Sequence, residues 1–88
     1  MGWEGIFAKG FRAALRLNRD GLTFEAISHR PEYDGQAYGR GMYAAVEAFS
    51  GWLDLAEREA RSWGFTRETA RQLIAEAVGQ RAARRVRD

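Results

Sequence analysis

Two stripes of hydrophobic residues, one of large side chains and one of small ones, run side by side between Gln36 and Trp63. Both repeat at steps of three and four residues, which is the spacing of positions along one side of an α-helix. The large stripe consists of Tyr38, Met42, Ala45, Phe49, Trp52, Ala56 and Trp63, and the small one of Ala37, Gly41, Ala44, Ala48 and Gly51. Small residues let a neighbouring backbone come close, whereas large ones fill the space between elements. The pattern predicts one long central helix over residues 36–63, with Ser50-Gly51 as a place where it can bend.

A second helix is predicted directly after the sequence Trp63-Gly64-Phe65-Thr66. Gly64 suits the left-handed conformation just past a helix end, and Thr66 is a good N-cap for the next helix. Helical spacing then continues through Ala70, Leu73, Ile74, Ala77, Val78, Ala82 and Val86. Because the connection is so short, the helix over residues 66–86 should run antiparallel to the first and form an α-hairpin with it.

The first thirty residues fit two different structures. As a helix over residues 4–19, they place cations on one side, Lys9, Arg12, Arg16 and Arg19, and apolar side chains on the other, Phe7, Phe11, Ala14 and Leu15. As a β-hairpin over residues 11–27, they alternate apolar and polar residues on both sides of an Asn18–Gly21 turn. This turn favours a register that would set Leu22 and Phe24 opposite the polar side of the first strand. A four-residue loop that pairs Leu17 with Leu22 would remove this mismatch, so both structures remain open.

We therefore predict a mostly α-helical single domain over residues 1–88, built on the long-helix hairpin with an N-terminal helical segment packed across it. The alternative is an α+β fold in which a β-hairpin over residues 11–27 packs on the two helices.

Residues 14–29, ALRLNRDGLTFEAISH, resemble the first two helices of helix-turn-helix DNA-binding domains. In such domains a helix, a glycine turn and a short Thr-capped helix precede the reading helix, so the resemblance implies DNA binding. It covers this fragment only. After His29 the chain continues with Pro31 and the sequence PEYDG in place of a tight turn, and the next helix offers only Arg40 as a base-reading cation.

The net charge of +2 is unevenly distributed, with the basic excess at the C-terminal end. The arginines there are Arg81, Arg84, Arg85 and Arg87. The helix dipole favours cations in the last turns of a helix whatever the protein does. Together with Arg12 and Arg16, these arginines are also the candidates for contact with a nucleic acid.

The sequence contains no recognisable catalytic, cofactor or metal motif. The absence of cysteine excludes disulfides and thiolate chemistry and fits a reducing compartment. His29, the only histidine, has no second ligand or base partner nearby in sequence. No stretch approaches the ~20 apolar residues of a membrane span, and no cleavable leader is apparent. We expect a cytoplasmic, non-enzymatic protein with no cofactor, no bound metal, no membrane contact and no small-molecule substrate.

Aromatic residues beside arginine are the remaining clue to function. Tyr33, Tyr38 and Tyr43 lie near Arg40, and Tyr43 is on neither hydrophobic stripe. Aromatic side chains and arginine are enriched in protein interfaces. The leading prediction is a small interaction protein that binds a protein partner, or a second copy of itself, as a regulator, inhibitor or accessory subunit. A small inhibitor or accessory protein of a phage or other mobile element would also have this size and this lack of catalytic motifs, although no residue argues for that origin. The alternative is a helix-turn-helix-like or Arg-rich nucleic-acid-binding protein.

Overall fold

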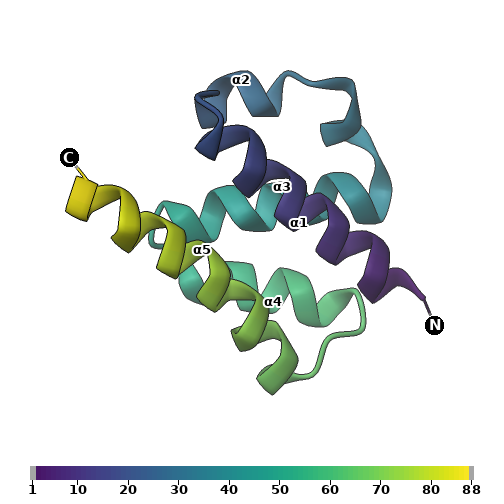
Figure 1. The fold of residues 1–88 in the computed structure, drawn as a ribbon. Helices are drawn as coiled ribbons and strands as arrows, with labels where there is room; N and C mark the ends of the chain where they lie inside the picture. Colours follow the sequence, from purple (N-terminus) through teal and green to yellow (C-terminus); the bar gives the residue numbers. More distant parts are fainter. Residues whose placement is uncertain (1, 88) are drawn as a thin grey trace.

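The computed structural model describes residues 2–87, with side chains described for residues 2–84. Within this part of the chain there are helices and no strands (Figure 1). The elements are α1 (Trp3–Arg19), α2 (Phe24–Ser28), the 3₁₀ helix η1 (Pro31–Asp34), α3 (Gln36–Phe49), α4 (Leu53–Ser62) and α5 (Arg67–Arg87). The prediction of a mostly α-helical domain is confirmed.

The N-terminal segment is the long helix α1, and the alternative of a β-hairpin over residues 11–27 is wrong. Ala13, Ala14 and Leu15 are all buried. Three consecutive residues cannot share one face of a strand, whereas a helix that crosses a neighbour closely can bury all three. α1 ends at a left-handed Gly21, with φ of 111°. The Thr23 hydroxyl then accepts a hydrogen bond from the Ala26 amide (3.1 Å) and caps α2, so the predicted short helix is present.

The single long helix predicted over residues 36–63 is also wrong, because the chain reverses direction between α3 and α4. Gly51 is left-handed, with φ of 93°. Its amide donates to the Ala48 carbonyl (3.1 Å), and the Trp52 amide donates to the Glu47 carbonyl (2.8 Å). These two bonds form a Schellman motif, which ends α3 and satisfies its last carbonyls. Trp52 therefore leaves the predicted large stripe and becomes 62% exposed.

The predicted turn at Gly64 is confirmed. Gly64 has φ of 109°. Its amide donates to the Arg61 carbonyl (3.1 Å) and the Phe65 amide to the Ala60 carbonyl (3.3 Å), so α4 ends in a second Schellman motif. The Thr66 hydroxyl accepts a hydrogen bond from the Thr69 amide (3.1 Å) and caps α5.

α3 lies at the centre of the fold, in contact with α1, α4 and α5. α1 crosses it at very short range, as the small stripe predicts. A Cβ built at Gly10 of α1 would overlap the Tyr38 carbonyl, and one built at Gly41 of α3 would overlap the Phe7 carbonyl. Both positions therefore need glycine so that the two backbones can touch. Ala37, Ala44 and Ala48 of the same stripe are buried as well.

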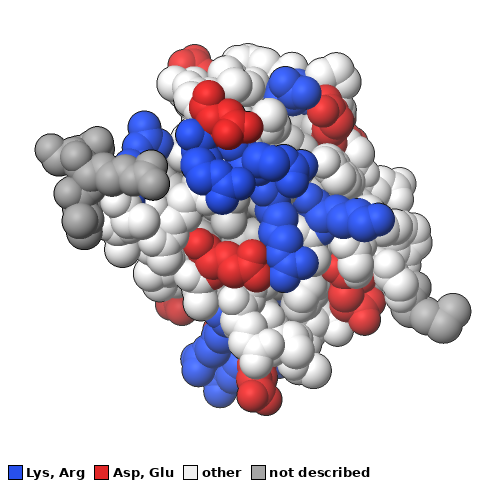
Figure 2. All heavy atoms as spheres, viewed as in Figure 1, with Lys and Arg blue, Asp and Glu red and all other residues white. Residues whose placement is uncertain are grey.

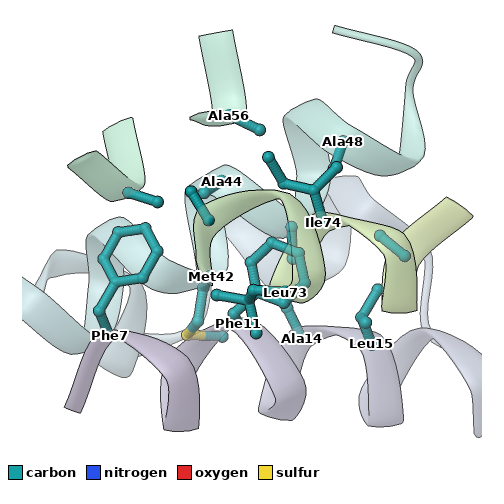
Figure 3. Close-up of a cluster of buried hydrophobic side chains, with 14 of the residues drawn as sticks. Phe7, Phe11, Ala14, Leu15, Met42, Ala44, Ala48, Ala56, Leu73 and Ile74 are labelled. Atoms are coloured by element: carbon teal, nitrogen blue, oxygen red, sulfur yellow. The ribbon is translucent and has the colours of Figure 1, made fainter. Parts of the chain in front are cut away.

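One cluster of buried apolar side chains connects all these helices (Figure 3). Phe7 and Phe11 of α1 are fully buried, as are Ile27 of α2 and Met42 of α3. Figure 3 shows the side chains of α1 pointing toward Leu73 and Ile74 of α5. The α1–α3 contact thus brings two helices together at their backbones, while the larger side chains fill the space toward α5.

None of the helices in the described part of the chain has the length and apolar character needed to cross a membrane.

We expect the substitution Gly41→Ala to lower the free energy of unfolding by about 1–3 kcal/mol, because the added methyl group forces α1 and α3 apart. Gly79→Ala is the matched control. Gly79 lies inside α5 with open space around its missing Cβ, so alanine there should raise stability by about 0.5–1 kcal/mol. Urea unfolding of both variants measures the difference, and an equal response at the two glycines would contradict the close crossing.

Candidate functional site

Three of the four residues predicted to bind a partner lie together at the junction of η1 and α3. The Arg40 guanidinium carbon lies 4.3 Å from the centre of the Tyr43 ring, which is a cation–π arrangement. The Tyr33 ring meets Tyr43 edge to face, with 6.3 Å between centroids. The fourth residue, Tyr38, lies apart. Its half-buried side chain packs against the core, and its backbone forms the contact with Gly10.

Arg40 is held in place by a carboxylate of α4. Its Nε and Nη2 atoms donate to the two carboxylate oxygens of Glu59, at 2.9 and 2.7 Å. The Trp63 indole nitrogen donates to the same carboxylate (3.1 Å). The hydrogen bonds from Arg40, together with the one from Trp63, lower the pKa of Glu59. Arg40 therefore links the tyrosines of α3 and η1 to α4 in a fixed arrangement.

Glu47 is a buried carboxylate beside this network. Its exposed fraction is 9%, and its Oε1 atom has no hydrogen-bond partner within the described part of the chain. Burial raises the pKa of Glu47, and the nearby charge of Glu59 raises it further, whereas Arg40 opposes both effects.

We group this network with the exposed side chains that follow it on the α3–α4 hairpin and call the group the hairpin face. Tyr43 and Glu47 are one turn apart on α3, and Leu55 and Glu59 are one turn apart on α4. The Arg40–Glu59 ion pair and the Trp52–Glu47 backbone bond hold the two helices against each other. The hairpin face consists of Tyr33, Arg40, Tyr43, Glu47, Trp52, Leu55 and Glu59.

Two members of this surface do not follow from the hydrophobic pattern of the sequence. Trp52 is 62% exposed and Leu55 is 40% exposed, although Trp52 belongs to the predicted buried stripe. The available signal was Ser50-Gly51. A glycine after a helical run suggests a helix end as readily as a bend, and a helix end places the next large side chains on the outside.

A second candidate surface is the solvent side of α1, which we call the cationic face: Lys9, Arg12, Arg16 and Arg19. These four are the only exposed residues between positions 9 and 19. Figure 2 shows basic side chains gathered in one patch along α1. Arg12 donates from Nε and Nη2 to the carboxylate of Glu76 on α5, at 3.0 and 2.8 Å. These hydrogen bonds to Glu76 raise the pKa of Arg12.

Arg81 and Arg84, the two C-terminal arginines whose side chains are described, lie in different places. Arg84 donates to the Asn18 side chain of α1 (3.0 Å), so it lies near the end of the cationic face. Arg81 is half-buried and approaches Gly51 at the α3–α4 turn instead. The side chains of Arg85 and Arg87 lie outside the described residues.

The resemblance to helix-turn-helix domains extends no further than its two helices. Residues 14–29 do form the end of α1, a glycine turn and the short helix α2. The following helix, α3, would have to be the reading helix. α3 is packed against α1, α4 and α5, and only Gln36 and Arg40 of its residues are exposed, so it offers little surface to a DNA groove.

The described residues contain no group of three or more His, Asp or Glu side chains that could hold a metal ion. Comparison with protein-family models, with curated proteins and with solved structures finds no match to this chain.

We expect Glu47→Gln to become more favourable for stability as the pH rises. The folded state raises the pKa of Glu47, so this residue's contribution to stability is complete below its unfolded value of about 4.3 and is lost as the pH rises through the folded value. Glutamine is neutral at every pH, so its contribution to stability does not change with pH. Urea unfolding measures the free energy of unfolding of both proteins at pH 4 and pH 7. The variant should be more stable relative to wild type at pH 7 than at pH 4.

The control for this pH dependence is Glu25→Gln, at an exposed glutamate of α2. It reports the general effect of removing a carboxylate. A Glu47→Gln difference that stays constant with pH, or that changes no more than the control, would contradict the role assigned to burial.

Proposed function

We propose that this chain is a non-enzymatic protein-binding module whose protein partner docks on the hairpin face. The observation that carries the proposal is the exposure of Trp52 and Leu55 on the same α3–α4 hairpin that holds the Tyr33–Tyr43–Arg40 arrangement. Tryptophan, tyrosine and arginine are the residues that contribute most to binding energy in protein interfaces. A regulator, inhibitor or accessory subunit would act through such a surface.

The fixed position of Arg40 supports binding at this surface. Immobilising a long side chain at an interface costs roughly 0.5–1.5 kcal/mol when it is mobile in the free protein. Arg40 is already held by two hydrogen bonds to Glu59 and by the Tyr43 ring. Tyr33 and Tyr43 are half-buried and have little freedom left to lose. The hairpin face is thus organised before a partner arrives.

Arg40 and Glu59, the ion pair of the hairpin face, are engaged with each other, which supports binding in preference to catalysis. Glu59 accepts hydrogen bonds from Arg40 and from Trp63, so it is poorly placed to serve as a general base. The cysteine-free sequence supports a reducing, cytoplasmic location for this binding.

The test uses two leucines of α4 that differ only in the side they occupy. Leu55, 40% exposed, lies on the hairpin face, whereas Leu53, 42% exposed, lines the groove between α4 and α5. Light scattering after size-exclusion chromatography first shows whether the partner is a second copy. Capture from the native host with the immobilised wild-type chain then supplies a heterologous partner for titration calorimetry.

We expect Leu55→Ala and Trp52→Ala to weaken binding by more than ~1 kcal/mol, with stability changed by only about 0.5 kcal/mol because both side chains are exposed. Leu53→Ala should bind like wild type. Equal affinities for all three variants, or a chain that is monomeric and captures no protein that survives purification, would refute the proposal.

A further inference from the structure

The solvent side of α1 differs in charge from that of the other long helices. The exposed residues of α4 and α5 mix both signs with apolar side chains, as Asp54, Leu55 and Arg58 do on α4. The exposed positions from Lys9 to Arg19 hold cations alone. Like charges three or four residues apart on a helix repel each other, so this arrangement destabilises α1 unless something neutralises it.

The chain itself neutralises little of this charge. Glu76 pairs with Arg12. Within the described part of the chain, no carboxylate lies within ion-pair distance of Lys9, Arg16 or Arg19. The cations also cannot turn inward, because Phe7 and Phe11 anchor the opposite side of α1 in the core.

A groove of about 550 Å³ runs beside the cationic face, between α1 and α5. Arg12, Arg16 and Arg19 line its α1 wall, and Glu76, Gln80 and Ala83 line its α5 wall. Gln80 donates to the Leu15 carbonyl (2.8 Å) and Arg84 to the Asn18 side chain (3.0 Å), so the two walls are joined along the end of the groove. Three arginines of α1 therefore line one groove, and hydrogen bonds join its two walls at one end.

We propose that the cationic face and this groove bind the phosphodiester backbone of a double-stranded nucleic acid. Arg19 lies ten positions after Lys9, which is about 15 Å along a helix axis. A linear series of cations over that length matches a linear polyanion better than a single phosphate group. Arginine suits this ligand because its planar fork donates two parallel hydrogen bonds to phosphate oxygens.

Other anionic partners fit this surface less well. A protein interface has an apolar centre, but no apolar residue is exposed between residues 9 and 19. A helix that binds a membrane surface inserts its apolar side, whereas that side of α1 is buried in the core. Single strands are held by stacking on aromatic side chains, and this stretch of α1 exposes none. Phosphate contacts carry no sequence information, so the binding should be independent of base sequence.

Fluorescence anisotropy with labelled 20-base-pair DNA and RNA duplexes tests the proposal across a series of salt concentrations. Four phosphate contacts predict a slope of log affinity against log salt of about −3 to −4 on duplex DNA. Arg16→Gln with Arg19→Gln should weaken binding at least tenfold and reduce the slope by about 2. The matched control is Arg58→Gln with Arg61→Gln, which removes two exposed arginines from α4 and should change affinity less than threefold.

A variant that should gain affinity provides a second, independent test of duplex binding. Glu76→Gln removes the carboxylate that pairs with Arg12 on the groove wall, so it should tighten duplex binding about threefold or more at low salt. Circular dichroism confirms that each variant keeps its helices. This gain cannot result from a misfolded chain.

Several results would overturn the proposal. These are no duplex binding by the wild-type chain at 50 mM salt, equal losses in the two double variants, or weaker binding after Glu76→Gln. Tighter binding to the single strand of the same sequence would overturn the assignment to a duplex. Binding to phosphatidylserine vesicles without binding to either duplex would assign the face to membranes instead. If one duplex is bound more tightly than the other, that difference in affinity identifies DNA or RNA as the ligand.

Discussion

α1 and α3 approach each other so closely at Gly10 and Gly41 that neither position can hold a side chain. The contact fixes the rotation of both helices. With Gly10 against α3, the side of α1 that carries Phe7 and Phe11 has to point into the core, and its cations have to point to solvent. With Gly41 against α1, the opposite side of α3 is left for α4 and for the tyrosines of the hairpin face. The positions of both candidate surfaces therefore follow from one contact between two backbones.

The two surfaces differ in the physics by which they would bind. The hairpin face combines half-buried rings, an exposed tryptophan and an arginine that is paired with Glu59, so its affinity would come from packing and desolvation. The cationic face carries exposed charges with few internal partners, so its affinity would come from phosphate neutralisation and fall steeply with salt. A chain with both properties could bring a protein and a nucleic acid together, and each surface can be altered without touching the other.

Much of the fold was accessible from the sequence because local chemistry and hydrophobic spacing agreed. The Gly64 and Thr66 signals gave the α4–α5 turn, and the small stripe gave the close crossing of α3. Spacing alone failed at Ser50-Gly51, because the stripes stay in phase across the break and periodicity cannot distinguish a bent helix from two helices. The same ambiguity affects function, because a continuous helix would bury Trp52, whereas two helices leave it 62% exposed.

The candidate sites were only partly predictable for a different reason. Tyr33, Arg40 and Tyr43 are near one another in sequence, so their association could be anticipated. The partners that define the sites are distant: Glu59 for Arg40 and Glu76 for Arg12. Long-range pairs of this kind depend on how the helices pack, which a single sequence does not specify. The segregation of Lys9, Arg12, Arg16 and Arg19 was visible from the start, but its meaning depended on whether residues 9–19 formed a helix or a strand.

Native-state hydrogen exchange tests most directly whether the α1–α3 contact holds the fold together. If it does, the amides of residues 11–15 in α1 and 42–48 in α3 should exchange only through the same opening, with a common free energy equal to that of global unfolding. Exchange of the α1 amides at a lower opening free energy, while those of α3 remain protected, would contradict the account. α1 would then be a separable element, and its cationic face would not be fixed by the core.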